Sequence, residues 1–216
     1  MKRLKIKDIH SLKNKRKIVC LTSYTPSITK AVEKYVDILL IGDSLGSVIY
    51  NMNNTRSVTL NMMKNHGRVV MESSNFPYSI IDMPYKSYIN KSSALKNALS
   101  LLKHTKCQAI KIEVSRKQIE LVSYLSQKKI EVVSHIGVRP QSYSNFSKIK
   151  AVGKSEKEKK QLIDLALKLE DAGSKIILLE CVYEETASLI TSRLKIPTIG
   201  IGSSVYCDGQ ILVIDD

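Results

Sequence analysis

The fold of this chain is decided by residues 109–135, which read AIKIEVSRKQIELVSYLSQKKIEVVSH. Runs rich in isoleucine and valine stand at the two ends of the stretch, over 109–113 and 131–135, and a helical pattern over 116–128 separates them. A strand, a helix and a second strand in this order are typical of a βαβ unit, whose two strands run parallel. The stretch therefore predicts an α/β fold.

The same alternation extends along the chain in both directions. Eight short apolar runs predict strands at residues 18–24, 38–43, 78–82, 109–113, 131–135, 175–180, 197–202 and 211–214. Helical patterns predict helices at residues 60–73, 93–104, 116–128, 156–172 and 184–193. No repeat, linker or domain boundary interrupts this pattern. Residues 1–216 are therefore expected to form one catalytic domain, an α/β barrel.

Composition excludes two broad classes of protein. Hydrophobic residues make up 43% of the 216 residues and the mean hydropathy is −0.10, which is ordinary for a globular chain and excludes a mainly disordered one. No apolar run reaches the roughly 18–20 residues that span a bilayer, so we expect no membrane partner. The four cysteines stand far apart, without the spacing of a zinc or redox site, which favours a reduced, cytoplasmic protein.

The net charge of +14 raises the question of a nucleic-acid partner. Residues 1–17 carry eight basic residues and one acid, and residues 147–160 carry six lysines and two glutamates, so two short stretches hold most of the excess. The chain has no Trp and only two Phe, whereas single-strand binding needs aromatic side chains beside a basic groove. We therefore expect no nucleic-acid partner, while anionic small molecules remain compatible with the charge.

Polar residues stand at the ends of five successive predicted strands. They are Asp43 with Ser44, Asp82, Lys111 with Glu113, His135, and Glu180. A single charged residue at a strand end is usually a turn former or a helix cap. Because the carboxyl ends of parallel strands line the site in barrels and open sheets alike, five in succession favour a functional site.

These residue types also suit one another chemically. Asp43, Asp82 and Glu113 are three hard oxygen donors of the kind that Mg²⁺ prefers, although each could instead pair with a lysine. Lys111 could bind an anionic substrate or stabilise an enolate. Glu180 lies between apolar neighbours, where desolvation raises a carboxylate pKa and suits a general base.

His135 fits either a site residue or a structural histidine at the barrel rim. The residues alone therefore predict metal-assisted proton abstraction next to a carbonyl group.

Seven segments contain or flank these residues: Ile41-Gly-Asp-Ser-Leu-Gly46, Asp82-Met-Pro84, Lys111-Ile-Glu113, Ser134-His-Ile-Gly-Val-Arg-Pro-Gln-Ser142, Leu179-Glu-Cys-Val182, Ile199-Gly-Ile-Gly202 and Asp208-Gly-Gln-Ile-Leu-Val213. In this order and at this spacing they resemble the ketopantoate hydroxymethyltransferase family. The N-terminal Asp8-Ile-His-Ser-Leu-Lys13 resembles the opening helix of that family. The resemblance covers nearly the whole chain.

The resemblance implies a (β/α)8 TIM barrel of the phosphoenolpyruvate/pyruvate superfamily that assembles as a homo-oligomer, in the family a decamer. By position, Asp43, Asp82 and Glu113 would ligate Mg²⁺, and Ser44 and Lys111 would hold the carboxylate of the 2-oxo acid. Asp43, Asp82 and His135 would also contact this substrate, and Glu180 would be the catalytic base. The implied reaction of pantothenate biosynthesis transfers a hydroxymethyl group from 5,10-methylenetetrahydrofolate, a folate, to 3-methyl-2-oxobutanoate, giving 2-dehydropantoate.

The chain departs from the family pattern at several positions, which include Tyr183 and Thr22-Ser-Tyr-Thr25. Val114-Ser115 and Ser203-Ser204 stand where the family has glycine-containing pairs, so we expect loops with less backbone freedom there. A complete barrel typically needs about 250 residues, and the last predicted strand ends near residue 216. We therefore expect a C-terminally truncated barrel that lacks the eighth helix and the C-terminal extension.

Two alternatives remain beside the transferase. One is a carbon–carbon lyase of the same superfamily acting on a 2-oxo acid, which would use the same metal and enolate. The other is a truncated, catalytically weakened homologue that acts as a binding or assembly partner.

Overall fold

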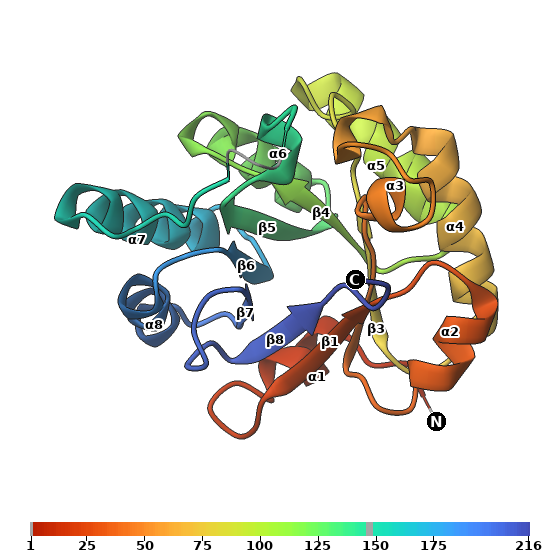
Figure 1. Cartoon of the computed structure of the whole chain (residues 1–216), viewed down its shortest axis with the longest axis horizontal. Helices are drawn as coiled ribbons and strands as arrows, with labels where there is room; N and C mark the ends of the chain where they lie inside the picture. The colour runs from red at the N-terminus through yellow and green to blue at the C-terminus, as the bar shows by residue number, and fades with distance from the viewer. Residues whose placement is uncertain (1, 146–148) are drawn as a thin grey trace.

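The computed structural model describes residues 2–145 and 149–216, and these form a closed barrel of eight parallel strands (Figure 1). Each strand pairs with the next in chain order, and the last pairs with the first. The strands are β1 (Ile18–Thr22), β2 (Ile38–Ile41), β3 (Tyr78–Asp82), β4 (Ala109–Glu113), β5 (Glu131–Gly137), β6 (Ile176–Glu180), β7 (Thr198–Ile201) and β8 (Gly209–Leu212). The prediction of a (β/α)8 barrel is confirmed.

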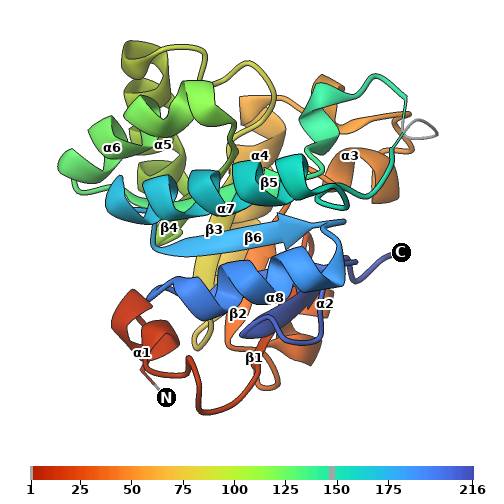
Figure 2. The same ribbon diagram turned by 90° about the vertical axis from the view of Figure 1, so that its left-hand side faces the viewer.

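Helices follow the first six strands and pack around the barrel (Figures 1 and 2). The α-helices are α1 (Ile6–His10), α2 (Pro26–Val32), α3 (Leu45–Val48), α4 (Leu60–Ser73), α5 (Lys91–Thr105), α6 (Ile119–Gln127), α7 (Glu156–Asp171) and α8 (Glu184–Arg193). Three short 3-10 turns join them: η1 (Thr55–Ser57), η2 (Arg116–Gln118) and η3 (Pro140–Ser142). In the described part of the chain, no helix is long and apolar enough to cross a membrane.

No helix follows β7 or β8 within the described residues. Residues 202–208 connect β7 to β8 without a helix. Two outward-facing side chains of the neighbouring strands are open to solvent, Val19 of β1 at 43% and Leu212 of β8 at 63% exposure. In the described part of the chain, the outer face of the barrel is thus uncovered at the junction where it closes.

Several elements differ from the sequence predictions, among them the short helices α2 and α3, which were not predicted, and strand β8, which begins earlier. Helix α2 was not predicted, because its seven residues include only three apolar side chains; it is set by Thr25, whose side chain caps Ile28 N, and by Pro26 in its first turn. Strand β8 begins at Gly209, two residues before the prediction. A Cβ at this position would lie 2.4 Å from Ile18 O, so glycine lets β8 reach β1 and close the barrel.

Two hydrophobic layers hold the structure together. Side chains that point into the barrel form one cluster, which includes Ile38, Tyr78, Val133 and Leu178, and alternate residues of the same strands pack outward against the helices in a larger cluster. Helix α1 closes the N-terminal end of the barrel, where Ile9 is fully buried in the inner cluster. The opposite, C-terminal end is left for polar side chains.

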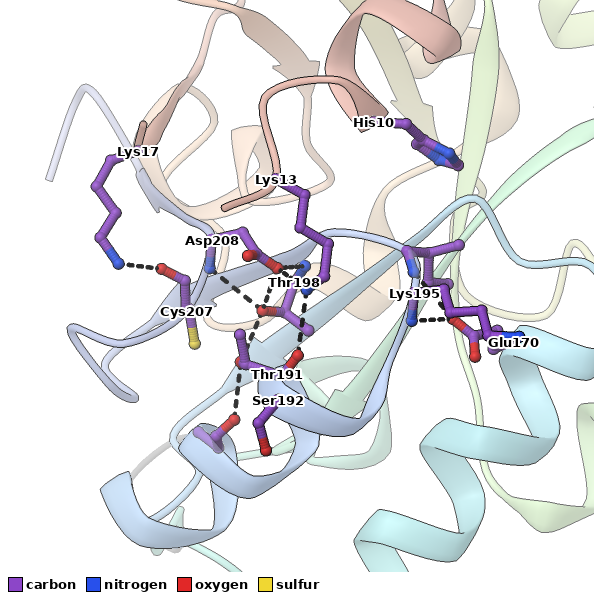
Figure 3. A network of polar contacts seen from close by, with 12 residues as sticks. His10, Lys13, Lys17, Glu170, Thr191, Ser192, Lys195, Thr198, Cys207 and Asp208 are labelled. Atoms are coloured by element: carbon purple, nitrogen blue, oxygen red, sulfur yellow. Dashed lines mark hydrogen bonds and ion pairs between the residues drawn. The ribbon is translucent and has the colours of Figure 1, made fainter. Parts of the chain in front are cut away.

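A buried ion pair ties the N-terminal segment to the β7–β8 turn (Figure 3). Lys13 Nζ lies 2.6 Å from Asp208 Oδ2 and also donates to Thr191 O of α8 at 3.1 Å. The same Asp208 oxygen accepts from Thr198 N at 2.8 Å. The two charged side chains are only 9% and 5% exposed, so the network links three separate segments where helices are missing.

Replacing Lys13 by methionine should therefore destabilise the fold strongly. It leaves the Asp208 carboxylate buried without its cation, and the loss of one partner of a buried pair typically costs about 3–5 kcal/mol. Lys15→Met, at an exposed position nearby, is the matched control. The free energies of unfolding in urea should differ by several kcal/mol between the two variants, and equal values would contradict a stabilising role for the pair.

Candidate active site

The C-terminal end of the barrel holds a cavity of about 670 Å³. Among its lining residues are all seven that the sequence predicted, namely Asp43, Ser44, Asp82, Lys111, Glu113, His135 and Glu180. The alternation along the strands explains this convergence. Ile110 and Ile112 of β4 pack outward, so Lys111 and Glu113 between them must point inward. The register then places Lys111 beside Asp82, and Glu113 beside His135.

Four of these side chains form a line across the cavity. Lys111 Nζ lies 3.1 Å from Asp82 Oδ1 on one side and 3.3 Å from His135 Nδ1 on the other. His135 Nε2 in turn lies 3.3 Å from Glu180 Oε2, in an alignment too poor for a hydrogen bond. Because a lysine ammonium can only donate, Nδ1 of His135 accepts and the imidazole proton resides on Nε2, facing Glu180.

The charges of this line are set by burial and by one another. Burial alone would lower the pKa of Lys111, but the negative charges of Asp82, Asp43 and Glu113 outweigh it and raise the pKa, so the ammonium stays charged. Burial, reinforced by the charge of Lys111, lowers the pKa of His135. At neutral pH a neutral imidazole therefore stands between a cation and the Glu180 carboxylate.

A second group of contacts centres on Gln141, in the turn η3 that follows β5. Its backbone N–H donates to both carboxylate oxygens of Glu113 at 3.1 Å, and its Nε2 donates to Asp43 Oδ2 at 2.7 Å. Tyr88 OH donates to Gln141 Oε1 at 2.5 Å. Gln141 thus orients two of the three predicted metal ligands.

Sequence reasoning did not select Gln141 as a site residue. The one feature of the sequence that could have indicated Gln141 was its place in the segment 134–142, shortly after the strand that carries His135. The contact with Asp43 spans 98 residues of sequence, and no local pattern indicates it.

The carboxylates are crowded in a way that suits a cation. Burial, and then the nearby charge of Asp82, raise the pKa of Asp43 to about 7. Burial and the charge of Asp43 raise the pKa of Glu113 well above its usual range. Asp82 Oδ1 is buried and has no hydrogen-bond partner apart from its ion-pair contact with Lys111.

The carboxylates Asp43, Asp82 and Glu113 could supply part of the coordination shell of Mg²⁺, but not all of it. In the described ranges, no group of three or more His, Cys, Asp or Glu side chains is closed tightly enough to hold a metal ion alone. Mg²⁺ usually takes only one or two protein carboxylates and fills its other positions with water and substrate oxygens. Asp82 Oδ1 accepts no hydrogen bond, and Asp82 lies next to the buried carboxylate of Asp43. These two side chains could therefore supply the protein carboxylates that Mg²⁺ needs.

Ser44 lines the cavity next to these carboxylates. It begins the short helix α3, and its Oγ lies 2.7 Å from the hydroxyl of the buried Tyr24. Burial raises the pKa of Tyr24 to about 12, so this hydroxyl keeps its proton at neutral pH. Ser44 thus presents a neutral hydroxyl group to the cavity, which suits hydrogen bonding to a carboxylate.

Glu180 is held at the end of β6 by two unusual backbone conformations. Gly137 of the neighbouring strand has φ of +96°, and a Cβ there would lie 2.3 Å from Glu180 O. Cys181, the next residue, has φ of +48°, which is uncommon for a side chain other than glycine. The Glu180 side chain is 20% exposed against 3% for Asp82, so this carboxylate is less fully desolvated than the sequence suggested and remains open to the cavity.

At the two positions where the family has glycine-containing pairs, the backbone of this chain adopts no conformation that requires glycine. Neither Val114-Ser115 nor Ser203-Ser204 has a positive φ. Ser115 caps η2 by accepting from Lys117 N, and Ser203 Oγ donates to Leu179 O at 2.9 Å while accepting from Val182 N at 3.0 Å. These serines hold the loops around the cavity through hydrogen bonds of their own.

Comparison of sequences relates the chain to one enzyme family. The family model described as ketopantoate hydroxymethyltransferase matches residues 3–216. The 3-methyl-2-oxobutanoate hydroxymethyltransferase of Pelagibacter ubique is 44% identical over 212 residues, which cover 98% of this chain and 81% of the relative. The enzyme of the same name from Helicobacter pylori is 39% identical, covering 100% of this chain and 80% of the relative.

Comparison of structures relates the barrel to more distant enzymes. A 2,3-dimethylmalate lyase, described as a member of the PEP mutase/isocitrate lyase superfamily, superposes with a TM-score of 0.73 at 14% identity, covering 97% of this chain and 78% of its own. A phosphonopyruvate hydrolase in complex with oxalate and Mg²⁺ superposes with a TM-score of 0.68 at 10% identity, covering 96% and 80%. At such low identity these likenesses concern the fold alone.

The raised pKa of Asp43 predicts a specific dependence of stability on pH. In the unfolded chain Asp43 ionises near its ordinary pKa of 3.8, whereas in the fold it keeps its proton up to about pH 7. The folded state therefore loses stability through this group as pH rises from about 4 to 7. Asp43→Asn removes the titration, so its stability relative to the unsubstituted protein should improve over that range by at least about 1 kcal/mol.

The measurement is unfolding in urea at a series of pH values without divalent cations. Asp171→Asn, at an exposed position at the end of α7, serves as the control and should show no such trend. A difference between Asp43→Asn and the unsubstituted protein that does not change with pH would show that Asp43 ionises normally in the fold.

Proposed function

Because this chain belongs to the ketopantoate hydroxymethyltransferase family, we propose that it transfers a hydroxymethyl group from 5,10-methylenetetrahydrofolate to 3-methyl-2-oxobutanoate in pantothenate biosynthesis. One observation of the site carries the proposal. All seven residues that the family pattern marks line one cavity, with Lys111 and Glu180 on either side of His135. Residues 1–216 would act as a single catalytic domain in the cytoplasm, within a homo-oligomer.

Lys111 and Ser44 would hold the carboxylate of the 2-oxo acid. Among the described residues that line the cavity, Lys111 is the one lysine or arginine, and its raised pKa keeps it charged. The Ser44 hydroxyl lies on the adjacent wall, in contact with the Tyr24 hydroxyl, and would donate without changing the charge of the site. Together they fix which end of the substrate faces β2 and which faces Glu180.

Asp43 and Asp82, with Glu113 oriented by Gln141, would hold Mg²⁺ beside the substrate. When bound, Mg²⁺ supplies positive charge next to the keto and carboxylate oxygens, which lowers the cost of removing a proton from the adjacent carbon. The donor set supports this role, because the repulsion that raises the pKa of Asp43 is relieved by a cation.

Glu180 would remove the C3 proton of the substrate. Its side chain keeps an exposed edge toward the cavity, and the neutral His135 beside it presents Nε2–H to the same carboxylate. The C3–H electron pair becomes the enolate double bond while the proton moves to a Glu180 oxygen. The backbone of Gly137 and Cys181 holds this side chain in place.

Water would add to the methylene carbon of the folate, and both bonds from this carbon to the folate nitrogens would break as the two water protons move to the nitrogens, giving formaldehyde and tetrahydrofolate. The enolate carbon would then form a bond with the formaldehyde carbon, and the electron pair of its C=O double bond would move to the oxygen. This oxygen, which comes from the water, would take the proton held by Glu180 and become the hydroxyl group of 2-dehydropantoate.

The two alternatives fit the observations less well. A carbon–carbon lyase is favoured only by the fold, since the 2,3-dimethylmalate lyase that superposes is 14% identical. A binding partner without activity would not need the complete set of charged residues in one cavity, with Gln141 in contact with both Asp43 and Glu113. The transferase accounts for both the sequence relatives and the site.

Glu180→Gln should abolish proton removal while leaving the fold intact. The amide cannot accept the C3 proton, and loss of a general base typically costs about 10²–10⁴-fold in rate. The measurement is Mg²⁺-dependent exchange of the C3 proton of 3-methyl-2-oxobutanoate in D₂O, followed by NMR without folate. Glu184→Gln, at the exposed start of α8, is the control; exchange at the normal rate in Glu180→Gln would assign the base elsewhere.

Asp82→Asn should raise the Mg²⁺ concentration needed for half-maximal exchange by at least about tenfold, since it removes one charged oxygen donor from the metal shell. Titration of the exchange rate with MgCl₂ measures this, with Asp171→Asn as the control. An unchanged titration would contradict Asp82 as a ligand.

A further inference from the structure

One glutamine joins the ends of several neighbouring strands. Gln141 lies in η3, the turn after β5, yet its Nε2 donates to Asp43 Oδ2 after β2 at 2.7 Å and to Met83 O after β3 at 3.0 Å. Its backbone N–H donates to the Glu113 carboxylate at the end of β4 at 3.1 Å. Gln141 is 5% exposed, so these contacts are made away from water. One buried residue thus links the ends of four successive strands, β2 to β5.

The partners of the Gln141 amide fix its orientation. A backbone carbonyl can only accept, so the amide atom that faces Met83 O must be the nitrogen. The amide oxygen Oε1 therefore points the other way, where it accepts from the Tyr88 hydroxyl at 2.5 Å. Both amide hydrogens and the oxygen are thus occupied by protein groups. Gln141 is not among the described residues that line the cavity of the candidate active site, so it acts on that site through its neighbours.

Asp43 and Asp82 are each held by one carboxylate oxygen. Asp43 Oδ2 accepts from Gln141, and no described residue donates a hydrogen bond to Asp43 Oδ1. Asp82 Oδ2 accepts from Asp43 N at 3.0 Å, and Asp82 Oδ1 has only its ion-pair contact with Lys111. Each side chain therefore keeps one oxygen for a cation while the other oxygen fixes its direction. Hydrogen bonds of this kind orient the ligands of metal sites, and their loss typically weakens metal binding.

Tyr88 holds the Gln141 amide from the side away from Asp43. It lies in the β3–α5 segment, and its half-buried ring packs against the larger hydrophobic cluster. Its hydroxyl must be the donor, because the oxygen of an amide can only accept. Without this donor, the buried Oε1 would have no hydrogen-bond partner among the described residues, and the amide would be held through Nε2 alone.

We propose, building on the function proposed above, that Gln141 is a positioning residue for the metal ion and that Tyr88 in turn fixes Gln141. Gln141 holds Asp43 in the orientation that binds the ion, and Tyr88 keeps the amide from turning. The alternative is that Oε1 of Gln141 turns into the cavity and is itself a metal ligand. The two assignments differ in the effect of Tyr88→Phe, which frees Oε1. This change weakens metal binding if Gln141 only positions Asp43, and leaves it unchanged or tighter if Oε1 is a ligand.

The test measures metal binding directly, with MnCl₂ as the probe and the EPR signal of free Mn²⁺ as the readout. Mn²⁺ prefers the same oxygen ligands as Mg²⁺. Gln141→Met keeps the length of the side chain but removes a hydrogen bond to a charged group, so the Kd should rise about tenfold. Tyr88→Phe removes a hydrogen bond between neutral groups, and the Kd should rise roughly threefold.

Two matched changes on α6 serve as controls and should leave the Kd unchanged. Gln127→Met alters an exposed glutamine at the end of that helix. Tyr124→Phe removes a hydroxyl that forms no hydrogen bond with a described residue. The melting temperature of each variant is measured with and without MnCl₂. A merely structural role would lower the melting temperature of the metal-free protein and leave the Kd as it was, which would contradict the proposal.

The outcomes separate this assignment from the proposed function. Absence of Mn²⁺ binding by the unsubstituted protein would overturn the metal site of that function. Binding by the unsubstituted protein, with an equal Kd for Gln141→Met, would overturn the positioning role alone. An unchanged or lower Kd for Tyr88→Phe would also overturn it. Should Gln141→Met fail to fold, Tyr88→Phe decides between the two assignments, because its ring still fills the same space.

Discussion

The structure at the open end of the barrel depends on one buried ammonium group. Lys111 is 8% exposed, and it lies among carboxylates whose burial would be costly without a nearby cation. Its contact with Asp82 joins β3 to β4, and its contact with His135 joins β4 to β5. Removing this charge would leave Asp43, Asp82 and Glu113 facing one another without compensation. The Lys111 ammonium, which offsets the charge of these buried carboxylates, is also the group placed to bind an anionic substrate.

The barrel holds this cluster although no helix among the described residues covers β7 and β8. At the closed end, α1 covers the inner hydrophobic layer, and the Lys13–Asp208 pair joins the N-terminal segment to α8 and the β7–β8 turn. These contacts lie at the opposite end of the barrel from the reactive residues. Stability and chemistry are thus carried by different ends of the same strands, as is usual for this fold.

Most of the fold could be predicted because buried parallel strands leave a strong local pattern. Runs such as Ile38–Ile41 are apolar on both faces, and the helices between them are amphipathic, so all eight strands were located. The predictions failed where the determinant was short or distant. Helix α2 depends on a single capped turn with few apolar residues, and the start of β8 depends on the close approach of Gly209 to Ile18. Both are consequences of packing rather than of local preference.

For the site, the sequence by itself determined which residues reach the cavity. Period-two alternation and the parallel direction of the strands are local properties, and together they send Asp82, Lys111, Glu113, His135 and Glu180 to one end of one barrel. Only the tertiary structure decided how these groups act on one another. The position of Gln141 between Asp43 and Glu113 and the neutral state of His135 depend on distances across the barrel. Such distances arise when the barrel closes, because electrostatic and hydrogen-bond energies depend on separation in space rather than along the chain.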